Sequence, residues 1–341
     1  MRIALLKAPG ELEIRDVPAP PVGPDELLVK LKACGICTLE QRIYAGSMRV
    51  PLPVVPGHEA AGEVVEVGKA VVGDFPIGSR VALDLVMRCG ECYYCKIGKS
   101  NLCANRFKEG QRMLGGFSEY LAVRPSQAYV VPSSLDFAEA AFAEPLACCI
   151  HSLKRLHVAM TEDLLVVGSG VMGLLHLLAA RCMGLRITVS DPDPARLGVA
   201  RELGADFAVD PRETDIAAFA RSITDGRGFS SCVIASPAPA AFARAVPALA
   251  KCARVNIYTS YDEPVPVPID ANEIHRRELL VTGTEGRLEE DFFQAVRLLS
   301  FHKVDVRPLI SARTSFSRLA EGFAEAMSKR AFRVILEHEA P

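Results

Sequence analysis

Four cysteines lie close together in the first third of the chain and could hold one metal ion. Two residues separate each of the first three, and a longer gap precedes the last; they are Cys89, Cys92, Cys95 and Cys103. Zinc binds four such thiolates tetrahedrally, and an all-cysteine shell leaves no position for water or substrate. We therefore expect a structural zinc site here.

Disulfide bonds are the first alternative use of these cysteines. The chain has 11 Cys, an odd number, and its first residues show no apolar core of a secretory signal. Both features favour a reducing, cytoplasmic compartment, where clustered cysteines more often bind metal than pair covalently.

A nucleic-acid-binding ribbon is the second alternative. Basic residues surround the cysteines: Arg88, Lys96, Lys99, Arg106 and Lys108. The whole chain, however, has 39 basic against 41 acidic residues, so no extended basic surface is expected. No apolar run is long enough to cross a bilayer. We expect neither a nucleic-acid nor a membrane partner.

A second motif, rich in glycine, has the spacing of a dinucleotide-binding loop. The apolar run 163–167 precedes it, a helical stretch follows, and Asp191 lies 21 residues beyond Gly170. The glycines allow close approach to pyrophosphate at a helix N-terminus, and the acidic residue accepts bonds from ribose hydroxyls. Asp191 would repel a 2′-phosphate, which favours NAD over NADP. The expected cofactor contacts are Gly168, Gly170, Val171, Met172, Gly173, Asp191 and Arg196. Alternatively, the glycines only build a turn and Asp191 caps the next helix.

The elements that must position these groups differ along the chain. The first third is punctuated by Pro and Gly and predicts short strands, which suits an irregular barrel or sandwich. The expected strands are 27–31, 61–67, 79–83, 117–123 and 128–131.

After about Leu146, strands and helices alternate, which predicts a parallel sheet covered on both faces. The expected strands are 163–167, 186–190, 207–209, 232–235, 254–258 and 278–282. The tail has a helix over 288–301, a second over about 317–327 and a strand over 331–336. The tail is too short for a domain and is expected to complete the first one.

Several motifs together resemble those of zinc-dependent medium-chain dehydrogenase/reductases, in the sorbitol and threonine dehydrogenase branch. They occur in family order and cover nearly the whole chain: 33–37 (ACGIC), 56–62 (PGHEAAG), the loop 89–103, 115–120 (GGFSEY), 143–147 (AEPLA) and 168–173. The resemblance implies an α/β protein with a GroES-like catalytic domain, residues 1–147 and 286–341, and an inserted Rossmann NAD-binding domain, residues 148–285.

The resemblance also implies a catalytic zinc, so that we expect two zinc ions per chain. Cys37 and His58 match the first two ligands, and Glu59 and Glu144 are further candidates, either of which could instead lie behind the ligands. A ligating imidazole needs a partner for its other nitrogen, and Glu40 is a candidate. The alternative is that Cys37 and His58 are ordinary buried residues.

One segment departs from the family pattern. Members usually carry Ser or Thr two residues after the first ligand to relay the substrate proton, but this chain has Leu39, and Arg42 stands where some relatives have a relay histidine. A zinc-bound water, Thr38, Glu40 or Glu59 could serve instead.

The remaining cysteines are expected to have packing roles. Cys148 and Cys149 would pack on the helix that follows Glu144, and Cys182, Cys232 and Cys252 would lie in the core.

The expected activity is hydride transfer between NAD and a secondary alcohol in a polyol, cyclitol or related hydroxy compound. The partners would be that hydroxy or keto substrate and further copies of the chain, as a homodimer or homotetramer. Two alternatives remain: an epimerase or eliminase that uses bound NAD without net oxidation, and a non-enzymic nucleotide-binding protein that kept the fold.

Overall fold

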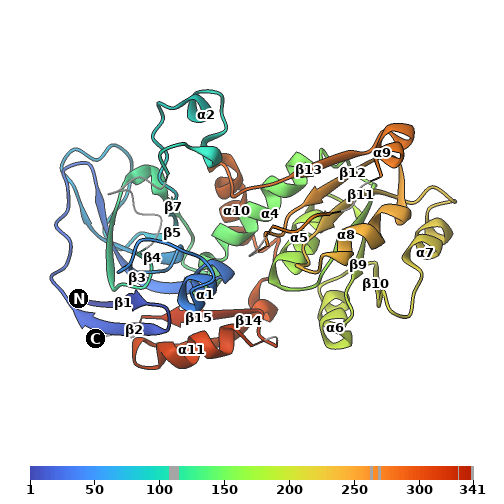
Figure 1. Ribbon diagram of the computed structural model, residues 1–341. Coiled ribbons are helices and arrows are strands. Elements are labelled where there is room, and N and C mark those ends of the chain that lie inside the picture. The colour runs from blue at the N-terminus through green and yellow to red at the C-terminus, as the bar shows by residue number, and fades with distance from the viewer. Residues whose placement is uncertain (107–114, 262–263, 268–269, 329, 339–341) are drawn as a thin grey trace. The chain divides into compact units, whose positions relative to one another are not determined.

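The structure is a computed structural model that describes residues 1–106, 115–261, 264–267, 270–328 and 330–338 (Figure 1). The basic residue Lys108 lies outside these ranges. The chain divides into two compact units, one formed by Met1–Ala147 with Leu288–Pro341 and the other by Cys148–Arg287. Among the described helices, none is long and apolar enough to cross a membrane.

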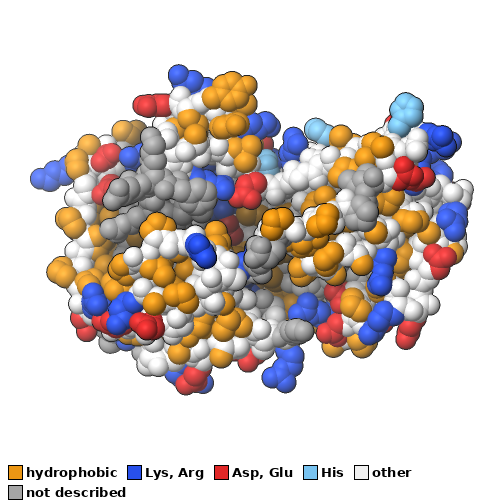
Figure 2. Space-filling model, viewed as in Figure 1, with side chains coloured by type: hydrophobic (Ala, Val, Ile, Leu, Met, Phe, Trp, Pro, Cys, Tyr) orange, Lys and Arg blue, Asp and Glu red, His pale blue; other side chains and the backbone are white. Residues whose placement is uncertain are grey.

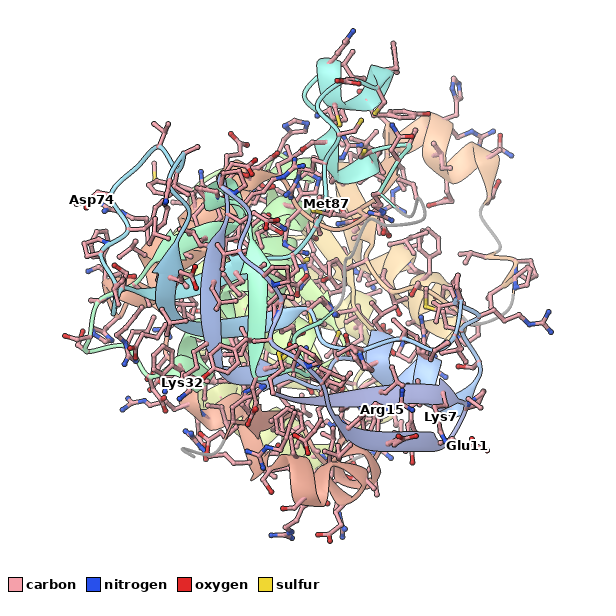
Figure 3. All side chains as sticks on the ribbon, turned by 90° about the vertical axis from the view of Figure 1, so that its left-hand side faces the viewer. Lys7, Glu11, Arg15, Lys32, Asp74 and Met87 are labelled. Atoms are coloured by element: carbon pink, nitrogen blue, oxygen red, sulfur yellow. The ribbon has the colours of Figure 1, made fainter. Side chains whose placement is uncertain are left out.

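The first unit is built on a seven-stranded sheet. Its strands follow the order β14-β15-β3-β4-β5-β7, with β6 also paired to β3. The bounds are β3 (Leu27–Gly35), β4 (Glu59–Val67), β5 (Arg80–Asp84), β6 (Tyr120–Val123), β7 (Ala128–Val130), β14 (Ile310–Thr314) and β15 (Arg333–Glu337). A separate two-stranded sheet joins β1 (Arg2–Ala8) to β2 (Glu11–Asp16), where Figure 3 labels Lys7, Glu11 and Arg15.

The last strand explains why the chain end belongs to this unit. β15 pairs with β3, and its residues Val334 and Leu336 are fully buried in the same apolar cluster as Val29 and Leu31. Burial of such aliphatic side chains is the main favourable contribution to folding. The helices of this unit include α1 (Thr38–Ala45), α3 (Phe137–Ala141), α10 (Glu289–Ser300) and α11 (Leu319–Ala326), and α4 (Ala143–Arg155) runs from it into the second unit.

A small lobe carries the four clustered cysteines. It contains α2 (Tyr93–Lys96) and a short 3₁₀ turn, Ser100–Leu102, and Met87 marks its base in Figure 3. Figure 2 shows apolar side chains on its surface, and Tyr93, Tyr94, Ile97 and Leu102 are exposed. The lobe therefore has little apolar core of its own.

The second unit is a six-stranded sheet in which every pair is parallel, as the sequence predicted. Its order is β10-β9-β8-β11-β12-β13, with bounds β8 (Asp163–Val167), β9 (Arg186–Ser190), β10 (Phe207–Val209), β11 (Phe229–Ile234), β12 (Leu249–Ile257) and β13 (Leu280–Gly283). The helices are α5 (Val171–Cys182), α6 (Pro194–Glu202), α7 (Ile216–Ile223), α8 (Ala240–Ala245) and α9 (Ala271–Arg277) (Figure 1). Successive residues Leu164, Leu165 and Val166 are all buried, which is the pattern of a strand covered on both faces.

Two predicted core cysteines are in fact exposed. Cys232 is buried in β11, but Cys182 and Cys252 are accessible to solvent. Cys182 is the last residue of α5, and Cys252 has φ 58, a left-handed turn conformation that interrupts the alternation of β12. The elements β1, β2, α1 and β14 were not predicted from sequence, because each is short and only partly apolar.

Candidate metal centres and cofactor site

Three potential metal ligands converge where β3 and β4 lie side by side. Cys37 follows β3 at the start of α1, His58 immediately precedes β4, and Glu59 is its first residue. Because the two strands are antiparallel, Gly35 stands opposite Glu59 and the two segments meet. One ligand atom of each of the three residues lies within 4.8 Å of the others.

His58 is oriented by the buried carboxylate of Glu40. Nδ1 of His58 lies 2.5 Å from Oε1 of Glu40, which also accepts a bond from the amide of Gly57 at 3.2 Å. The second oxygen of Glu40 accepts the amide of Cys37 at 3.1 Å. Glu40 thus joins both predicted ligands, and it turns Nε2 of His58 toward the cluster, an arrangement typical of metal-binding histidines.

Glu59 is held between a glycine and an arginine. A Cβ at Gly35 would lie 2.0 Å from Oε2 of Glu59, so the carboxylate needs a residue without a side chain there. On its other side, Nη2 of Arg333 lies 2.9 Å from Oε1, and Nη1 of Arg333 donates to the carbonyl of Ile36 at 3.2 Å. Both charged side chains are almost fully buried. Sequence reasoning missed Arg333, although an arginine within the apolar run of β15 was a signal.

Glu144 lies beside the cluster rather than within it. It is buried in the first turn of α4, and its Oε1 lies 3.9 Å from Nε2 of His58. The group of three mutually close donors contains Glu59 and not Glu144.

The charges of this cluster fit a divalent cation. Burial raises the pKa of Glu59 to about 7, although Arg333 opposes this, and burial also raises the pKa of Cys37. Burial would lower the pKa of His58, but the carboxylates of Glu40 and Glu144 outweigh it and raise that pKa well above its usual range. The groups therefore retain protons to offset their negative charge. Zinc would displace such protons and supply the positive charge instead.

The four cysteines of the lobe form a second cluster. Their sulfur atoms all lie within 4.8 Å of one another, and Sγ of Cys89 and of Cys95 are 4.0 Å apart. Tetrahedral zinc with bonds of about 2.3 Å places its sulfurs about 3.8 Å apart. Backbone amides of Cys92 and Asn105 donate to Sγ of Cys89 and of Cys103. Backbone amides, that of Cys92 foremost, lower the pKa of Cys89 to about 6, which favours the thiolate, whereas burial raises the pKa of Cys95 to about 12, which favours the thiol.

The residues of the altered proton-relay segment lie on the first turns of α1. Thr38 is exposed, and Leu39 and Arg42 are partly buried. Glu40 is wholly buried, with both oxygens engaged as described above. Glu40 therefore positions Cys37 and His58, and its carboxylate has no open path along which to pass a proton to solvent.

The glycine-rich loop lies at the carboxyl end of β8. Gly168 has φ 102, and its amide donates to Ser190 at the end of β9. A Cβ at Gly173 would lie 1.8 Å from the carbonyl oxygen of Gly168, so only glycine permits this close packing of α5. Val171 and Met172 form the first turn of α5, where the amides of the helix N-terminus and the helix dipole favour phosphate.

Asp191 and Arg196 lie beside this loop. The carboxylate of Asp191 accepts the amides of Ser169 at 2.7 Å and Asp193 at 2.8 Å, so its orientation is fixed. A Cβ at Gly170 would lie 3.6 Å from Nη1 of Arg196, so that the guanidinium adjoins the second glycine of the loop.

Cys148 and Cys149 are both buried on α4, and the thiol of Cys149 donates to the carbonyl of Met172 at 3.5 Å. This contact ties α4 to the start of α5.

Two family models match the chain. The model described as the alcohol dehydrogenase GroES-like domain matches residues 23–133, and the model described as zinc-binding dehydrogenase matches residues 171–300. The first match lies within the first unit, and the second covers most of the second unit and continues into residues 288–300 of the first. Both agree with the GroES-like and Rossmann folds expected from the resemblance.

Relatives are similar over almost the entire chain. A sorbitol dehydrogenase from Halalkalibacterium halodurans is 30% identical, with 96% of each chain covered. An L-threonine 3-dehydrogenase from Pyrococcus furiosus is 32% identical, with 94% of each covered. The crystal structure of a zinc-binding dehydrogenase from Sinorhizobium meliloti, bound to NADP, has a TM-score of 0.91 and 30% identity, with 98% of each chain covered. The chain therefore belongs to the zinc-dependent medium-chain dehydrogenases of the sorbitol and threonine dehydrogenase branch, and it is an oxidoreductase of alcohols or polyols.

Proposed function

We propose that this enzyme oxidises a secondary alcohol of a polyol, cyclitol or related hydroxy compound with NAD, and catalyses the reverse reduction. The observation that carries the proposal is the group formed by the partly buried Cys37 and the buried His58 and Glu59, whose donor atoms lie within 4.8 Å of one another. We assign the first unit as the catalytic domain and the second as the cofactor domain. Zinc held by this group would polarise the substrate oxygen, and NAD would accept the hydride.

Glu59, rather than Glu144, is the proposed third zinc ligand. Its carboxylate belongs to the close donor group, and Arg333 fixes one of its oxygens at 2.9 Å while the other remains on the side of Gly35. Glu144, 3.9 Å from Nε2 of His58, is placed to accept a hydrogen bond from a molecule bound at the open position. Three protein ligands and one open position are typical of catalytic zinc.

Thr38 is the proposed start of the proton route. Glu40 already uses both carboxylate oxygens to hold His58 and Cys37, so it is assigned to positioning. Leu39 has no exchangeable proton, whereas Thr38 carries an exposed hydroxyl one residue from Cys37. A hydroxyl there can pass the substrate proton to solvent.

The four cysteines of the lobe are proposed to hold a second, structural zinc. Their number leaves no open position, and the lobe exposes most of its large apolar side chains. A metal that closes the loop would supply the stability that an apolar core supplies elsewhere.

NAD is the proposed cofactor, although the related structure from Sinorhizobium meliloti holds NADP. The amides of Ser169 and Asp193 fix the carboxylate of Asp191 where ribose hydroxyls would meet it. That negative charge disfavours a 2′-phosphate. Asp191→Ala should lower the ratio of kcat/KM for NAD to that for NADP, with Asp193→Ala as the control. An unchanged ratio for Asp191→Ala contradicts the assignment.

A homodimer or homotetramer in the cytoplasm is proposed as the working form. Strand β13 lies at the edge of the parallel sheet, where a second chain could pair with it. None of the 11 cysteines, all of which are described, forms a disulfide bond in the structure, which suits a reducing compartment. Light scattering on the purified protein would measure the number of chains.

The activity is tested by NADH formation across polyols, cyclitols and L-threonine, with the zinc content measured in the same preparation. Turnover of a secondary alcohol by protein with two zinc ions per chain supports the proposal. No net NADH, but interconversion of substrate with catalytic NAD, would identify an epimerase or eliminase instead. A chain with zinc only in the lobe and no turnover contradicts the catalytic assignment.

A further inference from the structure

The topology of the second unit predicts where each half of the cofactor lies. Ligands of open parallel sheets bind beyond the carboxyl ends of the strands, near the point where strand order reverses. Here β8 carries the glycine loop, β9 on one side leads to Asp191, and β11 and β12 lie on the other side. If Asp191 meets the adenosine ribose, as proposed above, the nicotinamide half lies over the ends of β11 and β12.

Tyr258 is the first residue beyond β12, at this edge of the sheet. Its amide and that of Thr259 both donate to the carbonyl of Ile234, the last residue of β11, at 3.1 Å. The ring is half-buried and packs edge-on against the imidazole of His176, with centroids 4.6 Å apart and planes at 82°. The position of the aromatic ring is therefore set by a residue of α5.

His176 is a buried polar residue that the mechanism above does not use. Its Nδ1 lies 2.7 Å from the carbonyl of Met172, which cannot donate, so Nδ1 carries the proton. Nε2 is buried and has no hydrogen-bond partner among the described residues. Burial lowers the pKa of His176 to about 4, against the opposing effect of Met172, so the ring is neutral near pH 7.

An imidazole at this place carries a cost that an aliphatic residue would avoid. A buried acceptor without a partner is destabilising, and the neighbouring helix positions Leu175 and Leu177 are filled by leucine. What the imidazole adds is a fixed orientation: one edge is tied to the first turn of α5, and the ring meets Tyr258. This turn is also the end of α5 that would receive the pyrophosphate.

We propose that Tyr258 contacts the nicotinamide half of the cofactor and that His176 is a positioning residue that fixes the Tyr258 ring relative to the start of α5. The inference rests on the proposed binding of NAD. It adds that Tyr258, positioned by His176, acts on the nicotinamide half of the cofactor and not on the adenosine half. Tyr258 would form an apolar wall there, and edge-on aromatic contacts of this kind contribute modestly but measurably to stability.

The test compares two ligands on the zinc-loaded enzyme by calorimetry. NADH contains the nicotinamide, whereas ADP-ribose contains the remainder of the cofactor. Tyr258→Ala should weaken NADH binding about tenfold and change ADP-ribose binding less than about twofold, as loss of one local aromatic contact predicts. His176→Asn, which can still donate to Met172 but lacks the ring, should weaken NADH selectively by about threefold.

Phe219→Ala is the matched control. Phe219 forms an edge-on pair with Phe207 in the same unit, with centroids 5.4 Å apart, but it belongs to α7 and not to the end of β12. It should leave the ratio of the two affinities unchanged. Equal weakening of both ligands in Tyr258→Ala, or no weakening, overturns the inference. A wild-type chain that binds neither ligand overturns the cofactor assignment itself, and this inference with it.

Discussion

The two groups of potential metal ligands in the first unit are built in opposite ways. The lobe takes all four ligands from one short, exposed segment, 89–103, whereas the cluster around His58 joins residues from separate buried segments. In the lobe, backbone amides support the thiolates. Around His58, side chains support the potential ligands: Glu40 contacts the imidazole of His58, and Arg333 contacts the carboxylate of Glu59. A metal in the lobe would therefore maintain local structure, whereas a metal beside His58 would be held by a preformed fold that presents it to substrate.

The largest expected effect is the loss of activity without loss of fold. His58→Ala should lower kcat/KM by at least about 1000-fold, because Lewis-acid polarisation supplies several kcal/mol to the transition state. The Tm should fall because Glu40 loses its buried partner, but the chain should still fold, because β3 and β4 are held by their own core. Steady-state kinetics with calorimetry measure both quantities. Retained activity in a zinc-loaded His58→Ala chain contradicts the comparison.

Loss of a ligand in the lobe should instead lower the stability of the lobe. Cys92→Ser should destabilise the lobe by more than about 4 kcal/mol, since loss of a structural metal is among the most severe single changes. Hydrogen exchange of residues 88–106 measures this opening. Cys252→Ser, at an exposed cysteine of the second unit, is the control and should leave the lobe protected. Unchanged protection in Cys92→Ser would show that the lobe folds without its metal.

The ion pair behind Glu59 should be costly to break singly. Arg333→Met leaves a buried carboxylate without its cation, which should cost about 3–5 kcal/mol of unfolding free energy. Adding Glu59→Gln should recover part of that loss, because the remaining partner is then neutral. Chemical denaturation of the single and double variants measures the coupling. Strictly additive losses would mean that Arg333 does not position Glu59.

Two buried histidines outside the candidate metal site should respond to acid. Burial lowers the pKa of His176 and of His338 to about 4, whereas Glu40 and Glu144 raise that of His58. Between pH 6.5 and 4 the unfolded chain binds protons that these two folded imidazoles do not, so stability falls as pH falls. Each histidine should contribute a loss of about 3 kcal/mol. His176→Leu and His338→Leu should each flatten the measured dependence, and a wild-type profile without a slope contradicts the assignment.

Sequence alone predicted what is local in the chain. The cysteine spacing and the glycine loop each lie within a short segment, and the parallel sheet follows from the alternation of strands and helices. The grouping of Cys37 with His58 and Glu59 needed the family resemblance, because strand pairing brings these residues together. Arg333 was missed because its partner Glu59 lies at the other end of the chain, two strands away in the sheet. Cys252 was misplaced because a left-handed turn, φ 58, breaks the strand pattern there.

X-ray absorption at the zinc edge tests the central claim most directly, because it reports the ligand atoms of the wild-type protein. With both ligand groups filled, we expect two zinc ions per chain. One ion has four sulfur ligands, and the other has one sulfur ligand, with nitrogen or oxygen at about 2.0–2.2 Å completing its shell. One zinc ion per chain with four sulfur ligands, in protein that still turns over alcohol, would contradict it.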